Sequence, residues 1–352
     1  MSVHQIRTLV VDDSVFMRTV LRSALSNSPN IEVVATAQNG IEALEKIKSL
    51  KPDVLTLDIE MPGLTGLEVL ERVMKTDPMP IVMVSTKTQK GAVMTFQALE
   101  LGAVDYVAKP LADKNASLGG FRDKVVRAVE TAFASNRSRL ASTGGTHIMR
   151  PSTNNIRTDA VIAIGISAGG PATLHKLIPK LPQRFPPVVL TQHMPADFTG
   201  PFAKRLNEES ELEVREASSG DELRPGLLLL APGSAHLKVV KQEAHHVAHL
   251  DDGPKVSGFR PSVDVLLTSV AETFRDNAIG LVMTGMGCDG AEGIKALRRV
   301  GAQTMAQDKE SSVVYGMPKA AADTGCVDQV VSLAEIPNAL AKCLAASPTP
   351  TK

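Results

Sequence analysis

One serine of the sequence lies in a pattern that would expose its hydroxyl group for chemistry. Ser167 follows the apolar run 161–166 and is flanked by Gly165 and Gly169, which gives the pattern Gly-x-Ser-x-Gly. Small flanking residues permit a tight turn from a strand into a helix, and the first N–H groups of that helix can stabilise a developing oxyanion. The same pattern occurs in ordinary turns, so its interpretation depends on whether a base lies nearby.

A glycine-rich turn after a strand can also bind a phosphate group, but this turn lacks the residues required. A dinucleotide-binding turn has the pattern Gly-x-Gly-x-x-Gly and an acidic residue about 20 positions later. Here Ser167 occupies the position of the second glycine, and the next apolar run ends in Gln192 and His193 rather than in an acid. A P-loop does not fit either, because no Gly-Lys-Ser/Thr sequence ends the turn.

His193 and Asp289 are the candidate partners of Ser167. A serine hydroxyl needs a base to attack at neutral pH, and the base is usually a histidine oriented by a carboxylate. His193 ends the next apolar run, and Asp289 follows the run 279–284. Taken singly, His193 is explained as a hydrogen-bonded rim residue and Asp289 as the cap of a helix from Gly290. Together, at three strand ends around one crevice, the three side chains predict a Ser-His-Asp triad.

Two other groups of residues raise the alternatives of a metal site and a thiol site. His245, His246 and His249 lie in the polar segment 236–252, which we expect to form a hairpin. Adjacent residues of a strand face opposite sides, so a shared metal ion is the less favoured interpretation. We interpret Cys288 as a small packing residue rather than a nucleophile, since no histidine near it in the sequence could activate it.

Carboxylates form a second candidate site, in the N-terminal part of the chain. Asp12 and Asp13 follow the apolar run 8–11, and Asp58 ends the segment 54–58. The carboxyl ends of parallel strands meet at one edge of a sheet, and carboxylates crowded there favour a hard divalent cation such as Mg²⁺. One of these acids could then act as a nucleophile towards a phosphoryl group.

Two further side chains are expected at the same edge. Ser85 ends the next apolar run and offers a hydroxyl group, and Lys109 follows the fifth run and offers an ammonium for a phosphoryl oxygen. A single aspartate after a strand is usually a turn or cap residue. The combined placement of all these side chains at strand ends favours a phosphorylation site.

The elements that must position both sites are short apolar runs that alternate with segments of helical periodicity. This alternation predicts α/β domains with parallel sheets. It breaks at 134–158, which is rich in Ser, Thr, Asn, Gly and Arg and has no acidic residue. We therefore expect two doubly wound parallel-sheet domains, 1–125 and 159–347, joined over 126–158 by the end of a helix and a flexible linker. The predicted strands are 8–11, 31–35, 54–57, 81–84, 105–107, 161–166, 188–192, 228–231 and 279–284. In the first domain, helices are predicted after Ser14, Asn39, Thr65, Lys90 and Gly120, with Ser14 and Thr65 as N-caps.

Composition argues against several classes of protein. Lys plus Arg and Asp plus Glu both number 38, so no net charge attracts nucleic acid or an anionic membrane surface. The three cysteines form no Cys-x-x-Cys pair, which favours a reducing compartment over a disulfide framework or a zinc site. No signal-peptide pattern and no membrane-length apolar run is found. We expect a cytoplasmic, monomeric protein that binds no nucleic acid and does not insert into a membrane.

The motifs of the N-terminal part resemble those of a known family. "LVVDDS", "LDIEMPG", "VMVST" and "DYVAKP" are similar to the receiver domain of two-component response regulators over about residues 5–125. The resemblance implies a flavodoxin-like fold in which Asp58 accepts phosphate from a phosphohistidine kinase, while Asp12, Asp13 and Asp58 hold Mg²⁺. It also implies roles in sensing or contacting the phosphoryl group for three further residues: Ser85, the switch aromatic Tyr106 and Lys109.

The motifs of the C-terminal part resemble a second family. "GISAGGP", "TQHMP", "APG" followed by "HL", "RPSVDVL", "TGMGCDGAEG" and "SSVVYGMPKAA" are similar to the catalytic domain of the chemotaxis receptor methylesterases, the CheB family. The resemblance implies a Rossmann-like esterase domain that needs no cofactor. In it, Ser167 is the nucleophile, His193 the general acid and base, Asp289 the orienting carboxylate, and the backbone N–H of Met286 an oxyanion donor.

The two resemblances together imply a phosphorylation-regulated serine hydrolase. Its substrates would be γ-glutamyl methyl esters on chemoreceptors, cleaved with release of methanol during adaptation in bacterial chemotaxis, and specific receptor glutamines, which the same site would deamidate. Its partners would be a phosphohistidine chemotaxis kinase and methyl-accepting chemoreceptors. In the family the unphosphorylated receiver covers the esterase cleft, so phosphorylation of Asp58 is expected to shift the population towards an open arrangement.

Two other classes of function fit parts of the sequence. A receiver whose second domain binds a nucleotide or a partner through the glycine-rich turn would not need His193 or Asp289. A receiver-controlled transcription factor would need a basic recognition helix, whereas the basic stretch 134–158 lacks apolar helical periodicity. The esterase interpretation therefore explains more of the sequence.

Overall fold

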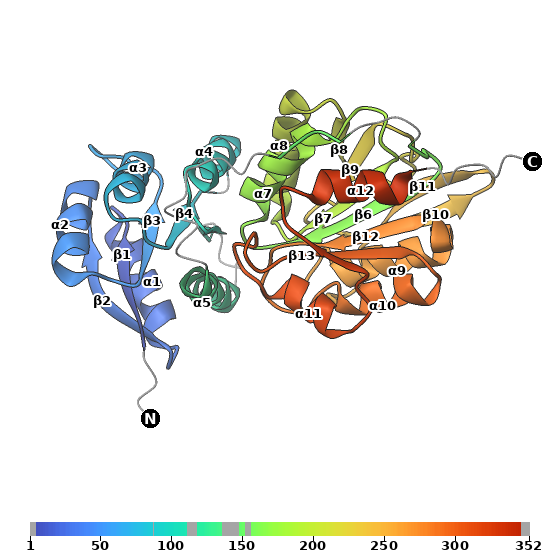
Figure 1. Ribbon diagram of the computed structural model, residues 1–352. Helices are drawn as coiled ribbons and strands as arrows, with labels where there is room; N and C mark the ends of the chain where they lie inside the picture. Colours follow the sequence, from blue (N-terminus) through green and yellow to red (C-terminus); the bar gives the residue numbers. More distant parts are fainter. Residues whose placement is uncertain (1–4, 87, 111–117, 136–147, 152–155, 346–352) are drawn as a thin grey trace, which may run out of the picture. The chain divides into compact units, whose positions relative to one another are not determined.

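The chain forms two compact units, one within residues 1–144 and one within 145–352. Figure 1 shows the helices and strands of each. The computed structural model describes residues 5–86, 88–110, 118–135, 148–151 and 156–345. Both units are α/β folds built on parallel sheets, as the alternation of apolar runs and helical segments predicted.

The first unit is built on a five-stranded parallel sheet with the strand order β2-β1-β3-β4-β5. This is the flavodoxin-like doubly wound order. Parallel strands are buried on both faces, which explains why "TLVV", "VLTL" and "IVMV" read as continuous runs. The strands are β1 (Ile6–Val11), β2 (Ile31–Ala37), β3 (Val54–Asp58), β4 (Ile81–Ser85) and β5 (Asp105–Ala108). Each contains its predicted core and extends it by one or two residues at an end.

The helices of the first unit begin at capping side chains. The helices are α1 (Val15–Ser26), α2 (Gly40–Leu50), α3 (Gly66–Thr76), α4 (Gln89–Glu100) and α5 (Leu118–Ala134). The predicted N-caps are confirmed: Ser14 accepts from the N–H of Met17, and Thr65 forms a capping box with Glu68. Thr88 caps α4, so this helix begins just before the predicted start after Lys90. Helix α1 packs against α5, whereas α3 packs against α2 and α4.

The second unit is built on a seven-stranded parallel sheet with the order β14-β13-β12-β6-β7-β9-β8. The strands are β6 (Val161–Ile166), β7 (Val188–Gln192), β8 (Glu213–Glu216), β9 (Leu227–Leu230), β12 (Ala278–Val282), β13 (Gln303–Gln307) and β14 (Gln329–Val331). The predicted hairpin is confirmed as an antiparallel pair, β10 (His236–Gln242) and β11 (His245–Asp251). The helices are α7 (Gly170–Leu177), α8 (Ala196–Glu209), α9 (Val263–Phe274), α10 (Ala291–Arg299), α11 (Met317–Asp323) and α12 (Ile336–Leu344).

Strand β6 is the point at which the connections of this sheet change direction. It pairs with β7 on one side and with β12 on the other. In doubly wound sheets a crevice opens at the carboxyl ends of the strands at such a switch point. The loops that follow β6, β7 and β12 therefore meet at one place, and these are the loops that carry the candidate triad.

Three strands of the second unit were not predicted, namely β8, β13 and β14. Strand β8 has the sequence Glu-Val-Arg-Glu and lies at one edge of the sheet, and the three-residue strand β14 lies at the other. Edge strands carry polar side chains on their open side, so they lack the continuous apolar runs of central strands. Strand β13, Gln-Thr-Met-Ala-Gln, is mostly buried, but the polar residues at its ends shorten its apolar run, so the sequence pattern did not indicate a strand.

The segment expected as a linker contributes contacts to the second unit. Ile148 is buried, Ile156 forms a bridge with Ala345, and the side chain of Arg150 pairs with Glu211. The second unit therefore begins before residue 159, where the sequence placed its start. The remaining parts of the expected linker, 136–147 and 152–155, lie outside the described residues. Among the helices of the described residues, none has the length and apolar character needed to cross a membrane.

Candidate active site

Ser167, His193 and Asp289 lie in one hydrogen-bonded chain at the switch point of the second sheet. The Ser167 Oγ atom lies 3.1 Å from Nδ1 of His193, and Nε2 of His193 lies 2.8 Å from Oδ2 of Asp289. The side chains of His193 and Asp289 are 6% and 0% exposed, whereas Ser167 is only half-buried. The side chains of His193 and Asp289 are thus shielded from water.

The turn that carries Ser167 is held by close backbone contacts. The N–H of Ser167 donates to the carbonyl of Thr284 at 2.9 Å, which links the ends of β6 and β12. A Cβ atom on Gly165 would come within 2.0 Å of Val263 Cγ1, so no larger residue fits at this position. Gly169 has φ +72° and is the N-cap of α7, a conformation that favours glycine. Packing therefore requires the first glycine of the Gly-x-Ser-x-Gly pattern, Gly165. The backbone conformation favours the second, Gly169.

The turn after β12 lies against the serine. A Cβ atom on Gly285 would come within 2.8 Å of the Cβ atom of Ser167, and the N–H of Gly285 donates to the carbonyl of Val314. Met286 is the next residue of this turn. Its role as an oxyanion donor remains a prediction, which this closeness supports.

Asp289 holds the N-terminus of a helix other than the one it precedes. Its carboxylate accepts from the N–H groups of Val263 and Asp264 and from the hydroxyl of Ser262, at 2.8–3.0 Å. The alternative interpretation, in which Asp289 only caps the helix from Gly290, does not hold, because these bonds direct the carboxylate to α9. Burial opposes the charged form of Asp289, but hydrogen bonds and charge from His193 and the backbone N–H groups outweigh burial and lower the pKa. The carboxylate is therefore ionised and fixed.

An aromatic ring covers the face of the candidate base. Phe259 stacks on His193, with ring centroids 3.8 Å apart and planes 6° apart. His236 holds the loop that carries this ring: its Nδ1 accepts from the N–H of Ser262, and its Nε2 donates to the carbonyl of Pro254. These residues were not predicted from the sequence. The "HL" and "RPSVDVL" motifs contained part of the signal, but no spacing rule placed them beside His193.

The thiol site and the metal site that the sequence raised as alternatives can be compared with the positions of Cys288 and the hairpin histidines. Cys288 is exposed, so its interpretation as a packing residue is wrong; the turn before Asp289 directs it to solvent. His245 pairs with Glu222 at 2.7 Å, and His246 packs on the ring of Phe274. Within the described ranges, the histidines of the hairpin belong to no group that could hold a metal ion.

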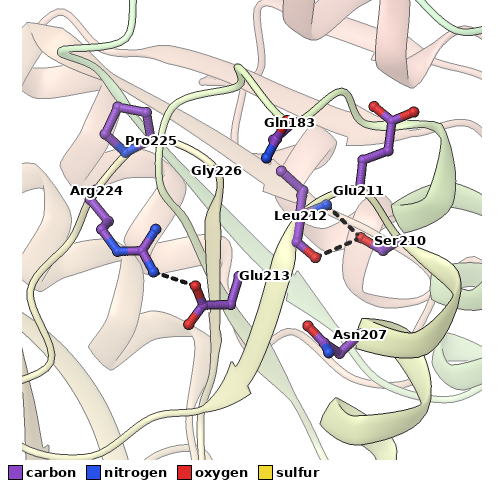
Figure 2. A pocket seen from close by; sticks show the side chains of 9 residues that line it. All are labelled: Gln183, Asn207, Ser210, Glu211, Leu212, Glu213, Arg224, Pro225 and Gly226. Carbon is purple, nitrogen blue, oxygen red and sulfur yellow. Dashed lines mark hydrogen bonds and ion pairs between the residues drawn. The ribbon is translucent and has the colours of Figure 1, made fainter.

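A cavity of about 340 Å³ lies elsewhere in this unit, between α8, β8 and the turn before β9. Figure 2 shows its lining, in which Arg224 pairs with Glu213 and Ser210 bonds to the backbone of Leu212. None of the triad residues lines it. Its charged groups are already paired, Arg224 with Glu213 and Glu211 with Arg150 outside the lining, so it shows no ligand chemistry of its own.

The first unit places Asp58 beside a lysine at the carboxyl edge of its sheet. The Nζ atom of Lys109 lies 2.8 Å from Asp58 and 2.9 Å from Asp12. Burial raises the pKa of Asp58 to about 6, and the charge of Asp12 adds to this effect while Lys109 opposes it. One ammonium thus faces two buried carboxylates, an arrangement that favours a further cation.

The acidic residues at this edge fit a divalent metal ion. Asp12, Asp13 and Asp58 can each present a ligand oxygen, and these oxygens lie within 4.8 Å of one another. Oxygen ligands of this kind suit Mg²⁺. The structure thus brings together the three residues that the sequence placed in a metal site.

The other two predicted receiver residues lie in the same unit, and their switch roles remain predictions. Ser85 is buried at the end of β4, and its hydroxyl donates to the carbonyl of Gly91 at 3.2 Å. Tyr106 is on β5 and is half-buried. Burial, with the charge of Asp105, raises the pKa of the Tyr106 phenol well above its usual range, so the phenol stays neutral.

Comparisons with known proteins identify the family of each unit. The family model for CheB methylesterase matches residues 162–340, and the response regulator receiver domain model matches residues 8–117. Proteins named protein-glutamate methylesterase/protein-glutamine glutaminase are similar along most of their length. The one from Syntrophotalea carbinolica is 45% identical over 94% of this chain and 95% of its own, and one from Caulobacter vibrioides is 47% identical over 94% and 96%. A crystal structure of the Thermotoga maritima CheB methylesterase catalytic domain aligns with TM-score 0.51 and 40% identity over 52% of this chain and 97% of that one. The chain therefore belongs to the CheB methylesterase family and combines a response regulator receiver domain with the catalytic domain of that family.

Proposed function

We propose that this protein is a phosphorylation-regulated serine hydrolase that removes methyl groups from glutamate γ-methyl esters of chemoreceptors and deamidates specific receptor glutamines. The observation that carries the proposal is the hydrogen-bonded chain from Ser167 through His193 to Asp289. The substrates follow from the relatives, whose names specify protein-glutamate methylesterase and protein-glutamine glutaminase activity. This reaction resets receptor signalling during adaptation in chemotaxis.

The acylation step uses all three side chains. Nε2–H of His193 donates to Asp289, so Nδ1 carries the lone pair that faces Ser167. Ser167 Oγ attacks the γ-carbonyl carbon of the substrate while Nδ1 takes the hydroxyl proton, and Asp289 stabilises the imidazolium that forms. The N–H of Met286 stabilises the oxyanion. When the tetrahedral intermediate collapses, the proton returns to the leaving oxygen and methanol departs.

Deacylation repeats the sequence with water as the nucleophile. His193 removes a proton from water, which attacks the acyl carbon, and the C–O bond to Ser167 breaks to give glutamate and the free hydroxyl. A glutamine side chain passes through a similar tetrahedral intermediate and releases ammonia. One site can therefore perform both reactions without a cofactor.

In the reaction of the receiver domain, Asp58 is the phosphoryl acceptor. An oxygen of Asp58 attacks the phosphorus atom of a phosphohistidine on the kinase, and the P–N bond breaks. Asp12, Asp13 and Asp58 would hold Mg²⁺, which would screen the charge between the carboxylates and the incoming phosphoryl group. Lys109 then pairs with a phosphoryl oxygen, while Ser85 and Tyr106 respond to the phosphorylated state.

Phosphorylation regulates the esterase through a population shift. The phosphoryl group must interact differently with the inactive and active arrangements, because a ligand with equal affinity for both shifts nothing. The partners of the protein are then a phosphohistidine chemotaxis kinase and methyl-accepting chemoreceptors. We also propose that it acts in the cytoplasm as a monomer.

A serine-reactive fluorophosphonate tests the assignment of the nucleophile. The phosphodonor-treated protein should form a covalent adduct, and peptide mapping should place it on Ser167. Ser167→Ala should not be labelled, whereas Ser210→Ala, which changes a serine at the separate cavity, should be labelled as the unchanged protein is. Absence of labelling in the active form would favour a binding module over an enzyme.

A further inference from the structure

Two acidic residues in the second unit exchange helix caps. Asp289 precedes α10 in the sequence but accepts from the first N–H groups of α9, those of Val263 and Asp264. Asp264 lies in the first turn of α9, yet its Oδ1 accepts from Gly290 at 2.9 Å and from Gly293 at 2.8 Å, in the first turn of α10. Asp289 therefore holds the start of α9, which carries Asp264. Asp264 in turn holds the start of α10, which follows Asp289 in the sequence.

Helix α10 depends on this exchange because it has no cap of its own. Its N-cap residue is Gly290, which has φ +104° and no side chain to accept from the first N–H groups. Unpaired N–H groups at a buried helix start are costly, and a carboxylate is the group that best satisfies them. Asp264 supplies that carboxylate and is 9% exposed, so water cannot take its place easily.

Helices α9 and α10 also pack so closely that the turn carrying Asp289 could move only at a cost in packing energy. A Cβ atom on Gly293 would come within 2.4 Å of Leu267 Cβ, and one on Gly290 within 2.9 Å of Val263 Cγ1. Asp289 and Gly290, at the end of the turn, are thus buried between α9 and α10. Any shift of Gly290 away from Asp264 would move the neighbouring Asp289 as well.

We propose that Asp264 is a positioning residue for the hydrolase reaction: by binding the N–H groups of Gly290 and Gly293, it fixes the turn that presents Asp289 to His193. The inference rests on the proposed function and adds to it a residue that touches neither substrate nor the reacting atoms. Asp264 acts through its acceptor oxygen. The burial that raises its pKa to about 6, together with the nearby charge of Asp289, is consistent with a group kept for its hydrogen bonds.

Three variants separate positioning from general destabilisation. Asp264→Ala removes the acceptor, whereas Asp264→Asn keeps an oxygen that can accept from both N–H groups. Asp328→Ala is the matched control: Asp328 also accepts from a backbone N–H and a hydroxyl, both of Thr304, but it lies beside β13 and α10 rather than at the triad. If the alanine variant fails to fold, Asp264→Glu replaces it, because its carboxylate is displaced by one methylene.

The first readout is methanol release from methylated receptor membranes by the full chain. A misplacement of about 1 Å at a reacting group costs about 100-fold in rate, so Asp264→Ala should lower kcat by about 10- to 100-fold with little change in KM. Asp264→Asn should recover most of the loss, and Asp328→Ala should keep the kcat of the unchanged protein. Equal kcat for Asp264→Ala and the unchanged protein, or no recovery in Asp264→Asn, would overturn the inference, as would an equal loss in Asp328→Ala.

The second readout does not depend on activity. The proton shared by His193 and Asp289 should give a low-field NMR resonance, assigned by its loss in His193→Gln. The resonance should persist in Asp264→Asn and Asp328→Ala and disappear in Asp264→Ala; its persistence there would overturn the inference. If the unchanged protein releases no methanol, the proposed function fails, and the resonance still decides whether Asp264 positions Asp289.

Discussion

At the residue scale, the chemistry of the second unit depends on which groups can reach water. Ser167 is half-buried, while His193 and Asp289 lie behind it in a shielded chain. Shielding strengthens the hydrogen bond between the base and its carboxylate, because charges interact more strongly away from water. The stacked ring of Phe259 closes one face of the base. We therefore expect the Phe259 ring to affect the rate, although it takes no part in proton transfer.

We expect Phe259→Leu to lower kcat by about 2- to 10-fold, because a stacked aromatic pair contributes about 0.5–1.5 kcal/mol beyond the area it buries. The leucine keeps most of the apolar bulk but not the flat contact with His193. Phe274→Leu is the control, since Phe274 makes a similar ring contact with His246 in the hairpin. Steady-state methanol release measures both variants, and an equal loss in the two would refute a specific role for Phe259.

Asp58 makes the first unit less stable as pH rises. Its pKa is raised from 3.8 to about 6, so the folded state holds a proton that the unfolded state has already lost. Stability from this group therefore falls as pH rises from about 4 to about 6. Asp58→Asn should raise the free energy of opening of the first unit at pH 7 by up to about 3 kcal/mol, and by little near pH 4.

Hydrogen exchange of the β3 amides in the presence of a chelator measures this difference. Added Mg²⁺ should reduce it, because the cation stabilises the ionised carboxylates of the unchanged protein but not the amide. Equal protection of the two proteins at pH 7 would contradict the burial argument for Asp58.

At the element scale, the strands that position both sites could be predicted from sequence because they are central. Strands β6 and β7 match their predicted bounds, since a strand buried on both faces must be apolar throughout. The edge strands β8 and β14 could not be predicted, because solvent on one side removes that requirement. The pattern of strand ends then brought Ser167, His193 and Asp289 to one crevice.

The loop and hairpin contacts around the triad could not be predicted in the same way. His236 reaches the site from β10 and Phe259 from an irregular loop, and neither position follows from strand order. The cap exchange between Asp264 and Asp289 depends on how closely two helices pack, which no local pattern reports. Sequence periodicity thus locates elements, whereas the second layer of a site is decided by contacts between distant segments.

The turn before α7 contains a glycine, Gly169, whose replacement by alanine we expect to destabilise the second unit. Gly169 has φ +72°, and a Cβ atom there would come within 2.5 Å of Val313 Cβ. Gly325 has φ +69° but no neighbour within 4 Å of such an atom. Both alanine variants carry the left-handed strain of roughly 1–2 kcal/mol, and Gly169→Ala adds an overpacking cost of about 1–3 kcal/mol.

We therefore expect Gly169→Ala to destabilise the second unit more than Gly325→Ala does, and to slow fluorophosphonate labelling of Ser167 as well. Calorimetric unfolding of the full chain, with the transition of the second unit resolved, measures the difference. Similar shifts for the two variants would show that the contact with Val313 does not matter.

At the scale of the whole molecule, the proposed function links phosphoryl chemistry in one unit to ester hydrolysis in the other. The two proposed sites use different residues, so we expect their coupling to be carried by a change in the population of arrangements. We expect a small-molecule phosphodonor with Mg²⁺ to stimulate methanol release by the unchanged protein and to leave Asp58→Asn at its basal rate. Glu45→Gln, a change on the exposed side of α2, should respond as the unchanged protein does. Stimulation of Asp58→Asn would contradict the assignment of the phosphoryl acceptor.

Methanol release from methylated receptor membranes, with phosphodonor present, tests the central claim most directly when Ser167→Ala is compared with the unchanged protein and with Ser210→Ala. We expect methanol release by the unchanged protein and by Ser210→Ala, and a rate at least about 10³-fold lower for a correctly folded Ser167→Ala. Methanol release by Ser167→Ala at the rate of the unchanged protein would contradict the assignment of a serine hydrolase.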